Sequence, residues 1–132
     1  MAVYLDTSAA LKLAVAEPES GALRDFLGRY SDGFVSSTLL AVELRRAALR
    51  ANDAAVALAA VGTVIPAIRL VGIDDDVIGQ ASILQPPALR SLDAIHLATA
   101  LILGPAVEAM ICYDKRLADA AAGAGIDVHS PR

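Results

Sequence analysis

The sequence predicts an α/β fold in which a central, mainly parallel sheet is flanked by helices. Short apolar runs alternate along the chain with longer segments of helical period, the pattern of strands joined by crossover helices. The composition is 56% hydrophobic but only 4% aromatic, which indicates a core of Ala, Leu, Val and Ile between closely packed helices. The length of 132 residues is enough for one core and too short for two, so we expect a single domain, residues 1–132.

The first third of the chain predicts a strand, a helical hairpin and a second strand. Pro18 cannot continue a helix, so it divides the helical region after the first strand into two. Asp32 and Gly33 then supply a turn. The elements expected here are a strand at 2–5, helices at 8–16 and 19–30, and a strand at 34–35.

The middle of the chain predicts a long helical region and a third strand. Ser36, Ser37 and Thr38 are capping residues, and the Ala-rich sequence that follows continues the helical region to about Val61. The acidic run 74–76 lies at a helix start, where negative charge is favourable, so we interpret it as capping and solvated surface. The elements expected here are a helix from 39 to about 61, a strand at 68–73, a helix at 74–84 and a loop at 85–87.

The last third predicts two helices that alternate with two strands. Ser91 is the expected cap of an apolar helix that Gly104 and Pro105 end. The elements expected here are a helix at 92–103, a strand at 109–113, a helix at 114–122 and a strand at 126–129.

Charge and composition exclude several classes of function. The net charge of −4 argues against broad attraction to a polyanion, so a nucleic-acid site needs a local basic rim. No run approaches the roughly 18 apolar residues of a membrane span, and the first residues lack the features of a signal peptide. We therefore expect a cytoplasmic protein. Cys112 lies in an apolar run and is expected to be a buried structural thiol.

Four acidic side chains are candidates for a common site. Asp6 and Asp114 each follow a predicted strand, so both fall at the carboxyl edge of a parallel sheet, where open α/β sheets bind ligands. Asp93 lies at a helix start, and Glu43 lies inside an apolar helix that does not require it. Taken singly, each acid is better explained by helix capping, the helix dipole or exposure than by a role in a site.

Convergence of these acids would require a cation. Carboxylates a few ångströms apart repel by about 4 kcal/mol per pair at an effective dielectric constant of about 20. Oxygen ligands without Cys or a paired-His motif favour Mg²⁺ or Mn²⁺, and Mg²⁺ commonly binds through few carboxylates, several waters and a substrate phosphate. Phosphate-ester chemistry is the natural candidate.

The segments around these acids resemble, in order, the motifs of PIN-domain nucleases. The matching segments are Asp6-Thr7-Ser8 after a strand, Glu43 after Ser-Ser-Thr, the run from Leu92 to Ala100 (LDAIHLATA), and the run from Tyr113 to Leu117 (YDKRL). More narrowly, the whole chain resembles a VapC-type toxin of a bacterial toxin–antitoxin pair.

This resemblance implies a PIN-like three-layer fold and Mg²⁺-dependent endonucleolytic cleavage of RNA by metal-assisted hydrolysis. Asp6, Glu43 and Asp93 match the family's three core acids, and Asp114 matches its more variable fourth position. Asp119, one turn further on, fits that fourth position less well.

The resemblance also implies a homodimer and a cognate VapB-type antitoxin. The Ala- and Leu-rich helices between Leu11 and Leu58 offer apolar surface that fits dimerisation or a partner helix, although core packing explains much of the same pattern.

Other polar residues near the expected site have two interpretations each. Thr7 and Ser8 either orient Asp6 or a water in the site, or cap the following helix. His96, one turn after Asp93, is expected to be packed among apolar neighbours rather than to act as a general base. Four basic side chains either contact phosphate or remain solvated: Lys12, Arg90, Lys115 and Arg116.

Rival functions fit the sequence less well. A receiver-type signalling domain needs an acidic pair after the first strand and a lysine after the last, whereas Asp6 stands alone and the last strand has none. A haloacid-dehalogenase-like phosphatase needs an acid where Ser8 stands, and a serine hydrolase needs a Gly-x-Ser-x-Gly turn. A PIN-like domain that binds RNA or a partner without cutting remains the alternative.

Overall fold

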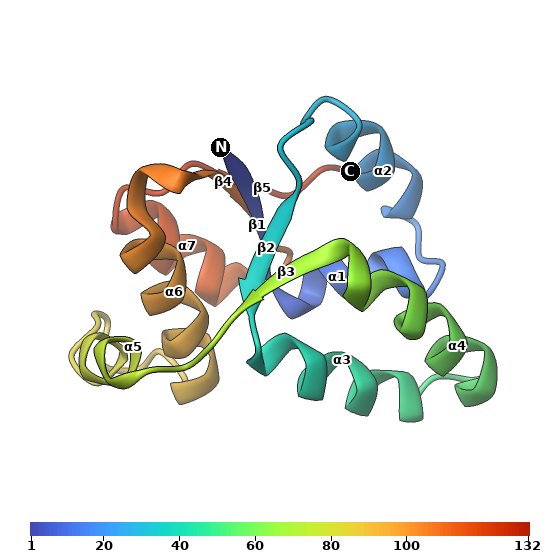
Figure 1. Ribbon diagram of the computed structural model, residues 1–132, viewed down its shortest axis with the longest axis horizontal. Helices are drawn as coiled ribbons and strands as arrows, with labels where there is room; N and C mark the ends of the chain where they lie inside the picture. The colour runs from blue at the N-terminus through green and yellow to red at the C-terminus, as the bar shows by residue number, and fades with distance from the viewer.

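The sheet of the computed structural model, which describes residues 1–132, has five strands in the order β3-β2-β1-β4-β5 (Figure 1). The strands are β1 (Ala2–Leu5), β2 (Phe34–Ser37), β3 (Ile68–Val71), β4 (Val107–Ile111) and β5 (Val128–His129). All neighbouring strands are parallel, which confirms the predicted sheet. The central strand β1 pairs with β2 on one side and with β4 on the other. Its carboxyl end therefore lies where the connections that follow these strands run to opposite faces of the sheet.

Seven α-helices lie on the two sides of this sheet (Figure 1). On one side are α1 (Thr7–Ala14), α2 (Ser20–Leu27), α3 (Leu39–Leu49) and α4 (Ala54–Val64). On the other side are α6 (Ser91–Leu103) and α7 (Lys115–Gly123), with α5 (Asp75–Ala81) packed against α6. Short 3₁₀ turns at Ile65–Ala67 and Gly104–Ala106 lead into β3 and β4. No helix is long and apolar enough to cross a membrane.

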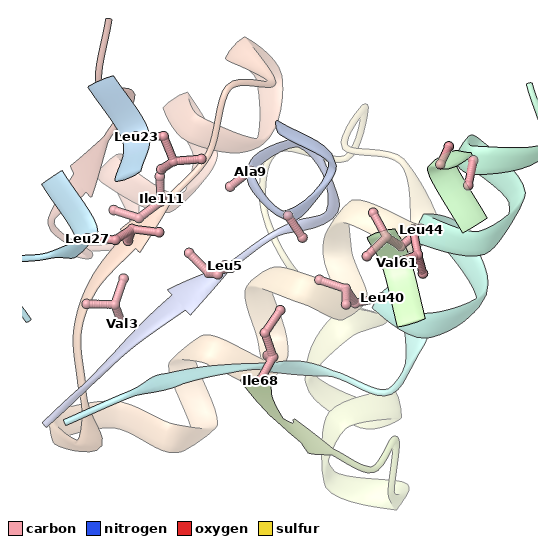
Figure 2. Packing of buried hydrophobic residues seen from close by; sticks show 13 residues of the cluster. Val3, Leu5, Ala9, Leu23, Leu27, Leu40, Leu44, Val61, Ile68 and Ile111 are labelled. Atoms are coloured by element: carbon pink, nitrogen blue, oxygen red, sulfur yellow. The ribbon is translucent and has the colours of Figure 1, made fainter. Parts of the chain in front are cut away.

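Alternation along β1 divides the interior into two cores. Val3 and Leu5 point into a cluster that includes Leu40 and Leu44 of α3 (Figure 2). Tyr4 points to the opposite face, where it packs with residues such as Leu97 of α6. Burying one such leucine contributes about 1.5–3 kcal/mol, so each helical layer is firmly attached to the sheet. The Tyr4 side chain therefore faces α6, whereas Asp6, which follows the same strand, is the N-cap of α1.

Two predictions about the helices were wrong. The helical region expected from 39 to about 61 is two helices, because the Asp53 side chain accepts a hydrogen bond from the Val56 backbone N–H (3.1 Å) and starts α4 anew. Ser91 is not a cap, since α6 begins at that residue, and the preceding Arg90 makes no side-chain cap. Asp74, in contrast, caps α5 through the Val77 N–H (2.9 Å), as predicted for the acidic run.

The predicted strand bounds also shift. The fourth strand was expected at 109–113 but spans Val107–Ile111, because its residues pair with Ala2 to Leu5 and the next two positions extend past the end of β1. The strand expected at 68–73 ends at Val71, where its pairing with Ser37 of β2 ends. The last strand is only Val128–His129.

Candidate active site

Asp6 is held at the end of the central strand by three hydrogen bonds. It is the N-cap of α1, and its Oδ1 accepts from the Ala9 N–H (3.0 Å) and the Ser8 hydroxyl (2.7 Å). Its Oδ2 accepts from the Cys112 thiol (3.1 Å). The residue is only 3% exposed, and this burial raises the pKa of its carboxyl against the opposing effect of the hydrogen bonds. A cation bound beside Asp6 would offset the cost of burying its carboxylate.

Asp114 lies at the same edge of the sheet as Asp6. Their strands β1 and β4 are neighbours, with Leu5 paired to Ile111. The Asp114 side chain caps α7 by accepting from the Leu117 N–H (3.1 Å), and its carbonyl accepts from Cys112 Sγ (3.3 Å). The Cys112 thiol therefore contacts both acidic residues.

Glu43 extends from the second turn of α3 and is half-buried. Its Oε1 accepts from the Thr7 hydroxyl (2.7 Å) and lies 2.7 Å from His96 Nε2. Burial alone would raise the pKa of Glu43, but the hydrogen bonds from His96 and Thr7 outweigh it and lower that pKa below its usual range. Glu43 is therefore ionised and fixed in place.

Asp93, in the first turn of α6, is under the influence of the other three acids. Burial raises the pKa of its carboxyl, and the negative charges of Asp114, Asp6 and Glu43 raise it further, while His96 opposes them. The pKa of Asp93 is therefore influenced by the charges of the other three predicted acids, which come from separate parts of the chain.

The donor set of this site fits a hard divalent cation. All four side chains offer carboxylate oxygens, and their mutual repulsion is relieved by positive charge. No three His, Cys, Asp or Glu side chains are arranged so that they could hold a metal ion by themselves. Mg²⁺ usually takes only one or two carboxylates and completes its shell with waters and substrate phosphate, so this open arrangement suits it.

The residues around the acids adopt defined roles. Asp6 caps α1, so neither Thr7 nor Ser8 does; Ser8 instead donates to Asp6 and accepts from the Tyr113 N–H (2.9 Å). His96 is 2% exposed, which confirms the prediction that it is packed. Cys112 is buried, as predicted.

Sequence reasoning missed one contributor, Tyr4, whose hydroxyl lies 2.7 Å from His96 Nδ1. The available signal was that Tyr4 is the one aromatic residue in the first strand, placed two positions before Asp6. A buried tyrosine hydroxyl ordinarily needs a hydrogen-bond partner, so this position pointed to a polar contact within the second core.

The four basic candidates fall into two groups. Lys12 is only 9% exposed, and its ammonium pairs with Glu17 (2.8 Å) and Glu19 (3.0 Å). Lys115 pairs with Asp119 (3.0 Å) on the exposed surface of α7. The exposed Arg90 and Arg116 form no ion pair. Of the four basic candidates, only Arg90 and Arg116 can contact a phosphate without first breaking an ion pair.

Comparison with known proteins places this arrangement in a family. The PIN domain family matches residues 3–123. Ribonuclease VapC46 of Mycobacterium tuberculosis is 44% identical over 130 residues, covering 98% of each chain, and ribonuclease VapC35 of that organism is 39% identical over 132 residues, covering 98% of this chain and 96% of the relative. The fold also matches a crystal structure of VapBC2 from Rickettsia felis bound to a DNA fragment from their promoter, with a TM-score of 0.78 and 8% identity over the full length of both chains. The chain therefore belongs to the PIN-domain family and, within it, to the VapC ribonucleases.

Proposed function

We propose that the chain is the toxin of a toxin–antitoxin pair and acts in the cytoplasm as a Mg²⁺-dependent endoribonuclease at Asp6, Glu43, Asp93 and Asp114. The observation that carries this proposal is that Asp6 and Asp114 follow the neighbouring strands β1 and β4 at one edge of the sheet; burial and, in addition, the charges of Asp114, Asp6 and Glu43 raise the pKa of Asp93. Such a cluster disfavours its own ionisation unless a cation is present. We expect Mn²⁺ to substitute for Mg²⁺, because both prefer oxygen ligands.

The side chains of the proposed site have different roles in hydrolysing a phosphodiester. When bound, Mg²⁺ supplies positive charge to the phosphate and lowers the pKa of an attacking water. Asp6 and Asp93 would hold the ion, and Ser8 and Cys112 fix the Asp6 carboxylate toward it. Glu43 and Asp114 would bind the ion directly or through water.

The decisive experiment is cleavage of total bacterial RNA by the purified protein with EDTA, Mg²⁺ or Mn²⁺. Cleavage that requires the metal and that stops in the variant Asp6→Asn supports the proposal and identifies the RNA target. Absence of cleavage under every condition contradicts it and favours a PIN-like domain that binds RNA or a partner without cutting.

Arg90 and Arg116 are expected to bind the RNA backbone on either side of the acids. Arg90 precedes the α6 turn that holds Asp93, and Arg116 lies two positions after Asp114. We expect Arg90→Ala and Arg116→Ala each to weaken RNA binding and to lower the slope of log K against log salt by about 0.7. Fluorescence anisotropy with the catalytically inactive protein at several salt concentrations measures this slope.

Arg29→Ala is the matched control, because Arg29 lies on the connection between α2 and β2 at the opposite edge of the sheet. It should leave the slope unchanged. If the two site variants behave like this control, the arginines do not contact RNA phosphates.

We further propose a cognate VapB-type antitoxin and a homodimer as assemblies of this chain. Apolar side chains that the fold leaves exposed on α3 and α4 support a partner: Val42 (57%), Leu49 (55%), Val56 (64%) and Leu58 (37%). Val42 and Leu49, seven positions apart, lie on one face of α3, and a contiguous exposed apolar face on a small protein is typical of an interaction site. We assign it to an apolar segment of the antitoxin.

A small antitoxin is expected to inhibit cleavage by covering this surface and placing a basic side chain against the four acids. Val56→Asp should weaken inhibition more than about tenfold, which corresponds to 1.4 kcal/mol, and leave cleavage by the free enzyme unchanged. Ile102→Asp on α6, a residue 42% exposed, is the control. Inhibition that survives replacement of every Arg and Lys of the antitoxin would rule out the basic side chain.

A further inference from the structure

A chain of buried polar contacts runs from the interior of the sheet to the acidic site. The Tyr4 hydroxyl, on the fully buried side chain of the central strand, lies 2.7 Å from His96 Nδ1. On the other side of the same ring, His96 Nε2 lies 2.7 Å from Glu43 Oε1. The tyrosine and histidine rings meet edge to face, with centroids 5.9 Å apart and an interplanar angle of 86°. The imidazole therefore has a partner at each nitrogen and little freedom to rotate.

The direction of these hydrogen bonds follows from the groups involved. A carboxylate oxygen can only accept, so His96 Nε2 carries a hydrogen, and in a ring with a single hydrogen Nδ1 is then left as an acceptor. The consistent assignment is that His96 Nε2–H donates to Glu43 and that the Tyr4 O–H donates to Nδ1. Tyr4 thereby favours the tautomer of His96 that can hold Glu43.

The two oxygens of Glu43 are consequently not equivalent. Oε1 accepts from both the Thr7 hydroxyl and His96, whereas Oε2 accepts no hydrogen bond from the protein. A free glutamate side chain samples many rotamers, and restricting it costs conformational entropy. Here that restriction is imposed by three elements of the fold, β1, α1 and α6, before any ligand arrives.

We propose that Tyr4 and His96 are positioning residues that hold Glu43 Oε1 so that Oε2 is presented to the cation of the active site. This inference rests on the proposed nuclease function. Neither residue touches the reacting atoms: His96 acts through Glu43, and Tyr4 acts through His96. Partners that orient a metal ligand in this way typically account for 10–100-fold in metal affinity or activity.

The test compares three replacements of His96 that differ in where they place an N–H group. His96→Gln can extend an amide N–H to the position of Nε2, His96→Asn reaches only the position of Nδ1, and His96→Leu offers none. Mn²⁺ binding to each protein without RNA is measured by electron paramagnetic resonance, and the Mg²⁺ concentration for half-maximal cleavage is measured separately. Melting in EDTA shows that each variant is folded.

We expect His96→Leu and His96→Asn to weaken Mn²⁺ binding 10–100-fold and to raise the half-maximal Mg²⁺ concentration by a similar factor. His96→Gln should recover most of the affinity, a rescue that a merely structural role for His96 would not produce. Tyr4→Phe should cause a smaller loss, because Glu43 still favours the Nε2–H tautomer.

Folded His96→Leu that binds Mn²⁺ as tightly as the wild type overturns the proposal. So does a folded His96→Gln that binds as poorly as His96→Leu. Wild-type protein that binds Mn²⁺ but cuts no RNA contradicts the nuclease function, and the binding comparison still decides whether Tyr4 and His96 position Glu43.

Discussion

Replacing Asp6 with asparagine is expected to lower the rate of RNA cleavage more than about 100-fold, beyond the loss seen when outer partners of a metal ligand are removed. Asparagine retains an oxygen that can accept from Ser8 and the Ala9 N–H, so the turn into α1 should survive. The negative charge that would hold the cation is lost. Initial rates at saturating Mg²⁺, with circular dichroism to verify the fold, measure the effect.

Asp53→Asn is the matched control for this prediction. Asp53 also caps a helix, accepting from the Val56 N–H, but it starts α4 and does not join the acidic site. Because asparagine caps helices about as well as aspartate, this variant should cleave RNA like the wild type. Unchanged turnover in Asp6→Asn, or equal losses in both variants, would disprove the assignment of the site.

Removal of charge at Asp93 is expected to stabilise the metal-free protein. Burial and the neighbouring acids raise the pKa of Asp93 in the folded state above its ordinary value of 3.8. The folded protein therefore binds this proton more tightly than the unfolded chain, and stability falls as pH rises from about 3.8 through the folded-state pKa. At pH 7 in EDTA, Asp93→Asn should melt at a higher temperature than the wild type, by a few degrees at most because solvent screens the partly exposed Asp93 carboxylate.

Thermal melts between pH 3 and pH 8 check this expectation. The advantage of the variant should vanish at acidic pH, where the wild-type carboxyl is protonated, and Mg²⁺ should stabilise the wild type more than the variant. A melting temperature below that of the wild type in EDTA at neutral pH would contradict the clustering of the acids.

The sequence could predict Asp6 and Asp114 as partners because their positions depend only on local pattern. Each follows a buried strand, and parallel strands end at the same edge of a sheet. The break between α3 and α4 could not be predicted in this way, since the Ala-rich sequence on both sides of Asp53 is compatible with one helix. Capping by the Asp53 side chain determines where α4 begins.

The contact between Tyr4, His96 and Glu43 lay beyond sequence reasoning for a different reason. Alternation on the first strand places Tyr4 opposite Val3 and Leu5, but it does not say which helix covers that face. The contact also requires α3 and α6 to be rotated so that Glu43 and His96 face each other across the carboxyl edge of the sheet. Such rotations are set by packing of the whole core.

Because β1 is synthesised long before β4, the pairing of these two strands has a consequence for the cell that makes this protein. Asp6 is synthesised 106 positions before Cys112, whose thiol donates to its carboxylate. Asp114, the last of the four acids, and α7 after it emerge later still. A nascent chain that has not reached β4 thus has β1 paired on one side only and an incomplete set of acidic side chains. The carboxyl edge of the sheet can therefore hold all four acids only after β4 and the start of α7 have been synthesised.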